Sequence, residues 1–294
     1  MAFGSWLHRH ECRSLHRLDC NIILAYSNNP MSNLLHHQTH RNSNPDAEWV
    51  MFIHGAGGGT ATWKKQIRDF GRHFHLVLVD LPGHAKSSQS CTEIPKYSFE
   101  FIAEKTWQIA DHLEIKKIHL VSVSLGSIVS MVMKEQQPER IKSMVFAGPI
   151  TSLDTKLRIV MKSGLMISGI IGFRNFYKLM AKIILPKKNH ESARKVFVRE
   201  ANALTDAEYK KWTAMYGKHL DATLKRVFSM APEVPIFLVV GTQDHFFLAT
   251  TKKYAQLFPS NIELSIIENC GHLVSLEKEE IFNQQSIDYI HTKK

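Results

Sequence analysis

Six continuous apolar runs recur along the chain, with amphipathic helical patterns between most of them. The runs span residues 49–55, 74–83, 117–124, 143–149, 236–244 and 262–272, and the helical patterns span 60–72, 98–113, 125–136, 250–258 and 277–290. Strands that are apolar throughout are typical of a parallel sheet covered on both faces. The alternation of strands and helices therefore predicts an α/β fold with a doubly wound sheet.

Two segments depart from this alternation. Residues 13–28 favour a hairpin that adds antiparallel to one edge of the sheet, and residues 28–48, rich in Asn, Ser, Pro and His, favour a loop. Residues 151–231 hold only helical patterns, and strand signals resume at Val234. We therefore expect a core domain of residues 1–150 and 232–294, with an all-helical insertion, a cap, at 151–231.

The composition of the chain indicates where in the cell we expect the protein. The chain has 294 residues, of which 44% are hydrophobic, which is enough to bury one large core. Its first dozen residues hold no apolar segment of signal-peptide length, and the most apolar stretch, 159–171, is interrupted by Lys162. Four scattered cysteines without a CxxC pair give little support to a disulfide or zinc framework. We expect a cytoplasmic protein without a membrane span.

The net charge of +10 is concentrated in one part of the chain. Between Lys156 and Arg199 there are eleven Lys or Arg residues and a single acid, Glu191. No nucleic-acid motif accompanies these charges, and the residues among them are largely Leu, Ile and Met, so we expect no nucleic-acid partner. Two interpretations stay open. The segment is either a solvated face of amphipathic helices or a surface for an anionic membrane or an acidic substrate.

The stretch "SVSLGS", residues 122–127, joins a predicted strand directly to a predicted helix. This places Ser124 on a sharp turn at the carboxyl end of the sheet, where open α/β folds bind ligands. Such a turn is crowded, and small residues on either side of it, here Ser122, Gly126 and Ser127, let the strand and helix pass closely. Glycine is more usual at the position of Ser122. A nucleophilic serine or a helix N-cap serine both fit this stretch alone.

Two later strand ends supply the partners that a serine nucleophile needs. A serine hydroxyl requires a base that is oriented by an acid, and in this fold the order along the chain is Ser, then Asp or Glu, then His. "GTQD" ends one predicted strand and "NCGH" ends the last, which brings Asp244 and His272 to the same edge as Ser124. We expect Ser124, Asp244 and His272 to form a catalytic triad.

The glycine-rich stretch "HGAGGG" follows the first apolar run. Its spacing matches neither GxGxxG nor GxxxxGK[ST], the patterns of phosphate-binding loops. We expect it to supply half of an anion hole, with backbone N–H donors from Ala56 and from Leu125, the residue after the nucleophile. Further substrate-binding positions are expected at His54, Gly55, Gly57 and Phe246. For His54, hydrogen-bonded support of the loop is favoured over proton transfer.

Together "HGAGGG", "DLPGHAKSS", "SVSLGS", "GTQDH" and "NCGH" resemble the α/β-hydrolase superfamily, in its branch of small capped esterases and lipases. The resemblance covers about residues 14–290 and implies a mostly parallel eight-stranded sheet. It also implies Ser124 as nucleophile, His272 as base and then acid, Asp244 as its orienting partner, and no metal or organic cofactor.

The expected function is hydrolysis of a small-molecule carboxylic ester with an apolar acyl group, through an acyl-enzyme. A thioesterase, a lactonase of the acyl-homoserine-lactone type, a carbon–carbon bond hydrolase, a cofactor-free perhydrolase and a non-catalytic small-ligand receptor stay open as alternatives, as does the oligomeric state. Histidines 36, 37 and 40 are interpreted as incidental and not as metal ligands. Asp80 and His84 are expected to be structural, and Cys270 to pack in the core.

Overall fold

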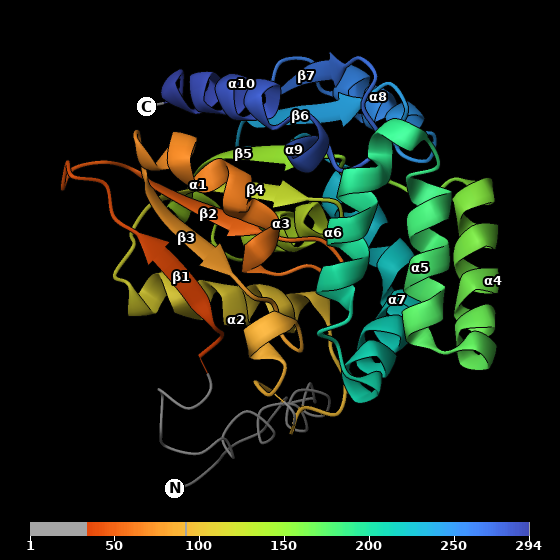
Figure 1. Ribbon diagram of the computed structural model, residues 1–294. Helices are drawn as coiled ribbons and strands as arrows, with labels where there is room; N and C mark the ends of the chain where they lie inside the picture. The colour runs from red at the N-terminus through yellow and green to blue at the C-terminus, as the bar shows by residue number, and fades with distance from the viewer. Residues whose placement is uncertain (1–33, 92, 294) are drawn as a thin grey trace, which may run out of the picture. The chain divides into compact units, whose positions relative to one another are not determined.

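A seven-stranded sheet lies at the centre of the computed structural model, which describes residues 34–91 and 93–293 (Figure 1). The strand order is β1-β3-β2-β4-β5-β6-β7. The strands are β1 (His37–His40), β2 (Trp49–Ile53), β3 (His75–Val79), β4 (Ile118–Val123), β5 (Ile141–Ala147), β6 (Ile236–Gly241) and β7 (Ile262–Ile267). All neighbours are parallel except β1, which pairs antiparallel with β3. The predicted mostly parallel α/β sheet is confirmed.

The edge strand β1 corrects one prediction and leaves another open. It falls inside residues 28–48, which we expected to be a loop, because its sequence HQTH is polar. An edge strand pairs on one side only and needs little apolar surface, so composition did not reveal it. The hairpin predicted at residues 13–28 lies outside the described residues, as do Cys12 and Cys20. The described residues form seven strands, so the implied count of eight strands is not confirmed.

Helices cover both faces of the sheet (Figure 1). Side chains alternate along β2, so that Val50 and Phe52 pack with helices on one face, and Met51 and Ile53 pack with helices on the other. The first face carries α1 (Lys64–Gly71), α9 (Val274–Glu277) and α10 (Glu279–His291). The second carries α2 (Phe99–His112), α3 (Leu125–Gln136) and α8 (Leu248–Leu257). This two-sided cover explains why the strands are apolar throughout.

Four helices fill the chain between β5 and β6. They are α4 (Thr155–Ile171), α5 (Phe173–Ile184), α6 (Glu191–Ala201) and α7 (Asp206–Phe228). Asp154 caps α4 by accepting a hydrogen bond from the Leu157 N–H at 2.7 Å, and Gly172, at φ 76°, separates α4 from α5. These helices lie beyond the carboxyl ends of the strands, beside the site described below (Figure 1). Residues 151–231 are called the insertion from here on.

None of the helices in the described part of the chain combines the length and the apolarity that crossing a membrane requires.

Candidate active site

Ser124 occupies a strained turn between β4 and α3. Its backbone has φ 53° and ψ −118°, a conformation that residues other than glycine rarely adopt. The turn brings α3 against β2 so closely that a Cβ on Gly126 would lie 2.4 Å from the Ile53 carbonyl oxygen. Glycine is therefore required there, while Ser122 is buried at the end of β4. The half-buried Ser124 hydroxyl is held at the carboxyl edge of the sheet.

Asp244, His272 and Ser124 form a continuous hydrogen-bonded line. His272 Nδ1 lies 2.8 Å from Asp244 Oδ2, and His272 Nε2 lies 2.9 Å from Ser124 Oγ. A carboxylate only accepts hydrogen bonds, so Nδ1 carries the proton and Nε2 is free to accept the Ser124 O–H. Asp244 and His272 are buried. They follow the adjacent parallel strands β6 and β7, as the strand-end positions predicted.

The imidazole of His272 is fixed from two further sides. The Phe247 ring packs against it, with 4.8 Å between ring centroids, and the Phe247 N–H donates to Asp244 Oδ1 at 3.2 Å. Gly148, at φ 52°, passes so close that a Cβ there would lie 2.4 Å from the His272 carbonyl oxygen and 3.0 Å from its Nδ1. The orientation of the ring therefore depends on several loops at once.

The predicted anion-hole residues line the same cavity as Ser124. Ala56 and Leu125 both line the cavity that opens above Ser124, and Gly55 approaches so closely that a Cβ there would lie 3.2 Å from Ser124 Cβ. Gly57 also lines the cavity, but its N–H donates to His84 Nε2 at 3.0 Å. Gly57 is thereby committed to the loop, which leaves Ala56 and Leu125 as the predicted donors.

His54 does not contact the cavity, which corrects its assignment as a substrate-binding residue. Its Nδ1–H donates to the Gly55 carbonyl at 2.7 Å, and its Nε2 accepts from the Leu81 N–H at 3.0 Å. The ring is completely buried, and this burial lowers the pKa of His54. A neutral imidazole with both nitrogens occupied supports the loop and is not placed to transfer a proton.

Asp80 and His84 also hold this region together. Asp80 Oδ1 accepts from the Thr60 N–H at 2.6 Å, and its Oδ2 lies 2.7 Å from His36 Nδ1. Burial keeps the pKa of His84 well below its usual range. Cys270 packs in the core, and burial raises the pKa of its thiol to about 12. These contacts are those of structural residues.

The cavity above Ser124 has a volume of about 180 Å³ and an apolar lining. Phe247 lines it, whereas the predicted Phe246 is not a lining residue and packs in a small buried cluster with Leu157 and Phe247. The insertion and the residue just before it, Ile150, form much of the wall. The lining residues from the insertion are Leu153, Leu157, Met161, Ile184, Val196, Phe197, Glu200, Tyr216 and Leu220. Glu200 is the one carboxylate among the described lining residues, and Arg199 pairs with it at 2.8 Å.

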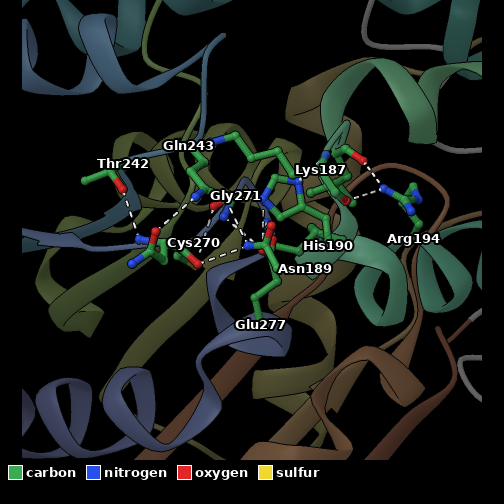
Figure 2. A network of polar contacts seen from close by, with 12 residues as sticks. Lys187, Asn189, His190, Arg194, Thr242, Gln243, Cys270, Gly271 and Glu277 are labelled. Carbon is green, nitrogen blue, oxygen red and sulfur yellow. Dashed lines mark hydrogen bonds and ion pairs between the residues drawn. The ribbon is translucent and has the colours of Figure 1, made fainter.

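A polar network that the sequence did not reveal ties the insertion to the loops of Asp244 and His272 (Figure 2). Glu277 accepts from the N–H groups on both sides of His272, at 2.9 Å from Gly271 and 3.2 Å from Leu273. The buried His190, from the α5–α6 connection, places Nε2 2.8 Å from Gln243 Oε1 and 3.6 Å from Glu277.

Asn189 extends this network by donating to Gln243 Oε1 at 3.0 Å and to the Asn269 carbonyl at 3.1 Å. These partners lie more than 50 residues apart in the chain. Only a glutamate shortly after His272 could have suggested the contact from sequence.

Comparison with known proteins identifies the family. The family model described as the alpha/beta hydrolase fold matches residues 48–279. A 2-hydroxy-6-oxononadienedioate/2-hydroxy-6-oxononatrienedioate hydrolase of Escherichia coli (strain K12) is 24% identical over 265 residues, covering 83% of this chain and 87% of that protein. A monoacylglycerol lipase of Xenopus laevis is 23% identical over 257 residues, covering 78% of this chain and 71% of the relative.

A solved structure repeats the fold. A thermophilic esterase from Thermogutta terrifontis superposes with a TM-score of 0.70 at 17% identity, covering 88% of this chain and 93% of the esterase. At this identity the likeness concerns the fold, whereas the family model rests on sequence and matches most of the chain. The chain therefore belongs to the α/β hydrolase fold family.

Proposed function

We propose that this protein is a serine hydrolase that cleaves a carboxylic ester with an apolar acyl group. The observation that carries the proposal is the unbroken line from Asp244 through His272 to Ser124, with contacts of 2.8 Å and 2.9 Å. This arrangement supplies a nucleophile, a base and an orienting acid in the geometry that acyl transfer requires.

The reaction follows from the protonation states in this line. Ser124 Oγ bonds to the acyl carbon as its proton passes to His272 Nε2, and Asp244 stabilises the resulting imidazolium through Nδ1–H. The oxygen that becomes negative is assigned to the N–H groups of Ala56 and Leu125. The intermediate collapses when His272 gives its proton to the leaving alcohol. Water then attacks the acyl-enzyme with His272 as base, which releases the acid and restores Ser124.

The lining of the cavity supports a neutral, apolar acyl group. Leucine, isoleucine, valine, methionine and phenylalanine side chains make up most of the wall. The described lining residues include a carboxylate, Glu200, and neither Lys nor Arg, so a second carboxylate on the substrate would be buried without a cation. The lining therefore favours a monoacyl substrate over a dicarboxylate such as the one in the name of the Escherichia coli relative.

A substrate panel with matched serine variants tests the proposal. The panel contains p-nitrophenyl esters of graded acyl length, a thioester and a lactone. Ser124→Ala should lose roughly 10⁴-fold or more of kcat because it removes the nucleophile. Ser122→Ala is the control, since its buried hydroxyl has no hydrogen-bond partner among the described residues, and it should keep wild-type kcat.

The panel also separates the alternatives. Preferential turnover of the thioester or lactone would change the substrate class while keeping the nucleophile. A wild-type protein that turns over nothing on the panel yet binds a small ligand would refute hydrolysis and make the chain a receptor. Loss of turnover in Ser122→Ala with retention in Ser124→Ala would move the nucleophile.

A further inference from the structure

The outer face of α4 is apolar and uncovered. Ile159, Met166 and Ile170 are 63%, 76% and 84% exposed, and their spacing of seven and four residues places them along one side of the helix. The opposite side of the same helix carries Leu157 and Met161, which line the cavity. Helix α4 is thus apolar on two faces, although only the inner one packs against protein.

This exposure is concentrated in one region. Ten large apolar side chains are exposed among the described residues, and six of them lie between Ile159 and Leu179 on α4 and α5. Single exposed apolar residues are ordinary, but a contiguous group of them marks a surface that contacts another apolar phase.

The neighbouring helix α5 presents positive charge. Its exposed residues Arg174, Lys178 and Lys182 recur at a spacing of four, and Lys187 and Lys188 follow at its end. The four lysines among them have no ion-pair partner within 4.0 Å in the described part of the chain; they are Lys178, Lys182, Lys187 and Lys188. The charges that we expected in this segment are therefore free to meet an external anion.

The positive surface continues between α5 and α6. A surface groove there is lined by Lys178, Lys182, Arg194, Lys195 and Arg199, together with Glu191. Glu191 is the acid of this groove and is paired with Lys195 at 2.7 Å. Its single charge is balanced locally, so the groove stays basic.

We propose that the outer face of α4 and α5 docks peripherally on an anionic lipid surface. In the interface of a bilayer, Ile159, Met166 and Ile170 would reach the acyl boundary while lysines contact lipid phosphates. A second copy of the chain satisfies the apolar face poorly, because it would bring two basic faces together. Nucleic acid would bind the lysines through its phosphates, but it would leave the apolar stripe in water, because bases stack on aromatic side chains and the stripe is aliphatic.

Docking in this way also places lipid beside the cavity. Because α4 contributes Leu157 and Met161 to the cavity wall, one helix separates the proposed membrane face from Ser124. The binding proposal does not depend on this consequence. Vesicle association is measured without any substrate, so it can fail or succeed independently of ester hydrolysis.

The test is sedimentation with vesicles of equal parts phosphatidylcholine and phosphatidylglycerol, and with vesicles of phosphatidylcholine alone. The wild-type protein should partition to the anionic vesicles at ~0.05 M salt and dissociate at ~0.5 M, because salt shortens the screening length. Negligible binding to both kinds of vesicle, or equal binding to both, would overturn the proposal. RNA binding, or a dimer in solution that the apolar variant below dissociates, would assign the face to another partner.

Two variants and their controls locate the face. Each lysine near an anionic surface contributes about 1 kcal/mol, or about fivefold in partition, so reversing four of them should weaken binding roughly a hundredfold or more. The variant is Lys178→Glu, Lys182→Glu, Lys187→Glu and Lys188→Glu. The control reverses four exposed lysines that lie outside the insertion and have no ion pair with any described residue, and it lowers the net charge equally: Lys64→Glu, Lys96→Glu, Lys116→Glu and Lys117→Glu.

The apolar stripe is tested in the same way. Ile159→Ser, Met166→Ser and Ile170→Ser together should lower anionic-vesicle binding roughly tenfold, since they remove the groups that enter the acyl boundary. The control changes exposed apolar residues elsewhere, Met230→Ser, Leu257→Ser and Ile281→Ser, and should bind as the wild type. Circular dichroism and turnover of a short soluble ester verify folding. Equal losses in a variant and its control would refute the assignment of this face.

Discussion

Replacing Ser124 with glycine should stabilise the fold while removing the proposed nucleophile. The turn at φ 53° and ψ −118° suits glycine, and a side chain there costs about 1–3 kcal/mol. Glycine also stabilises the unfolded chain by about 0.4–1 kcal/mol through its greater conformational entropy, which offsets part of the relieved strain. Ser124→Ala lacks the hydroxyl too but keeps the Cβ, so comparing the two variants isolates the backbone strain.

The expected difference is about 1 kcal/mol in favour of Ser124→Gly, or a Tm higher by about 2–4 °C for a chain of this size. Thermal unfolding followed by circular dichroism at one heating rate measures it, and urea midpoints provide a second estimate. Ser127, in regular helix α3, is the control position, where Gly should be less stable than Ala by about 1 kcal/mol. A Ser124→Gly variant that melts at or below Ser124→Ala would refute the strain argument.

Four further predictions concern the surroundings of the site and the core. Asp244→Asn should keep substrate binding but lose roughly 10⁴-fold in kcat, because the amide favours the wrong tautomer of His272, and a mild loss would point to another acid. Glu277→Ala should lower kcat up to roughly a hundredfold by loosening the loop that carries His272. Wild-type kinetics in this variant would show that the loop keeps its conformation without Glu277. Cys270, with its thiol pKa raised to about 12 by burial, should resist iodoacetamide in the folded protein and react in urea, as peptide mapping by mass spectrometry would show; rapid labelling of the folded chain would contradict this. His119 is buried in β4, and burial lowers its pKa from 6.5 to about 4, so protonation favours the unfolded state and stability should fall as pH decreases from 6.5 towards 4. Urea midpoints of His119→Gln should show a smaller fall, and identical slopes would exclude His119 as the source of the pH dependence.

The residues that sequence placed correctly are those with local signals. Ser124, Asp244 and His272 each follow a continuous apolar strand, and parallel strands bring their carboxyl ends to one edge of a sheet. Their positions are therefore fixed by strand ends and chain order. The fold class follows from the same alternation of apolar runs and helical patterns, whereas the short polar strand β1 has no such signal.

Side-chain direction in loops and contacts between distant residues were not predictable in this way. The side chain of His54 is buried beneath its loop. Of the two adjacent phenylalanines, Phe247 and not Phe246 lines the cavity, and the local backbone conformation of a loop decides which of two neighbouring side chains points inward. Ile159 and Ile170 belong to a helix that is apolar on two opposite faces. Periodicity identifies its faces but does not tell which one is covered by protein.

The network around His190 bears on how the insertion can be exchanged between family members. The α5–α6 connection is joined by hydrogen bonds to Gln243 and Asn269, and through them to the loops that carry Asp244 and His272 (Figure 2). Grafting a foreign insertion at residues 151–231 would remove Asn189 and His190 and leave Gln243 without these partners. A functional chimera must therefore transplant this junction together with its counterparts in the recipient core, so the insertion behaves as a module only when its junction is included.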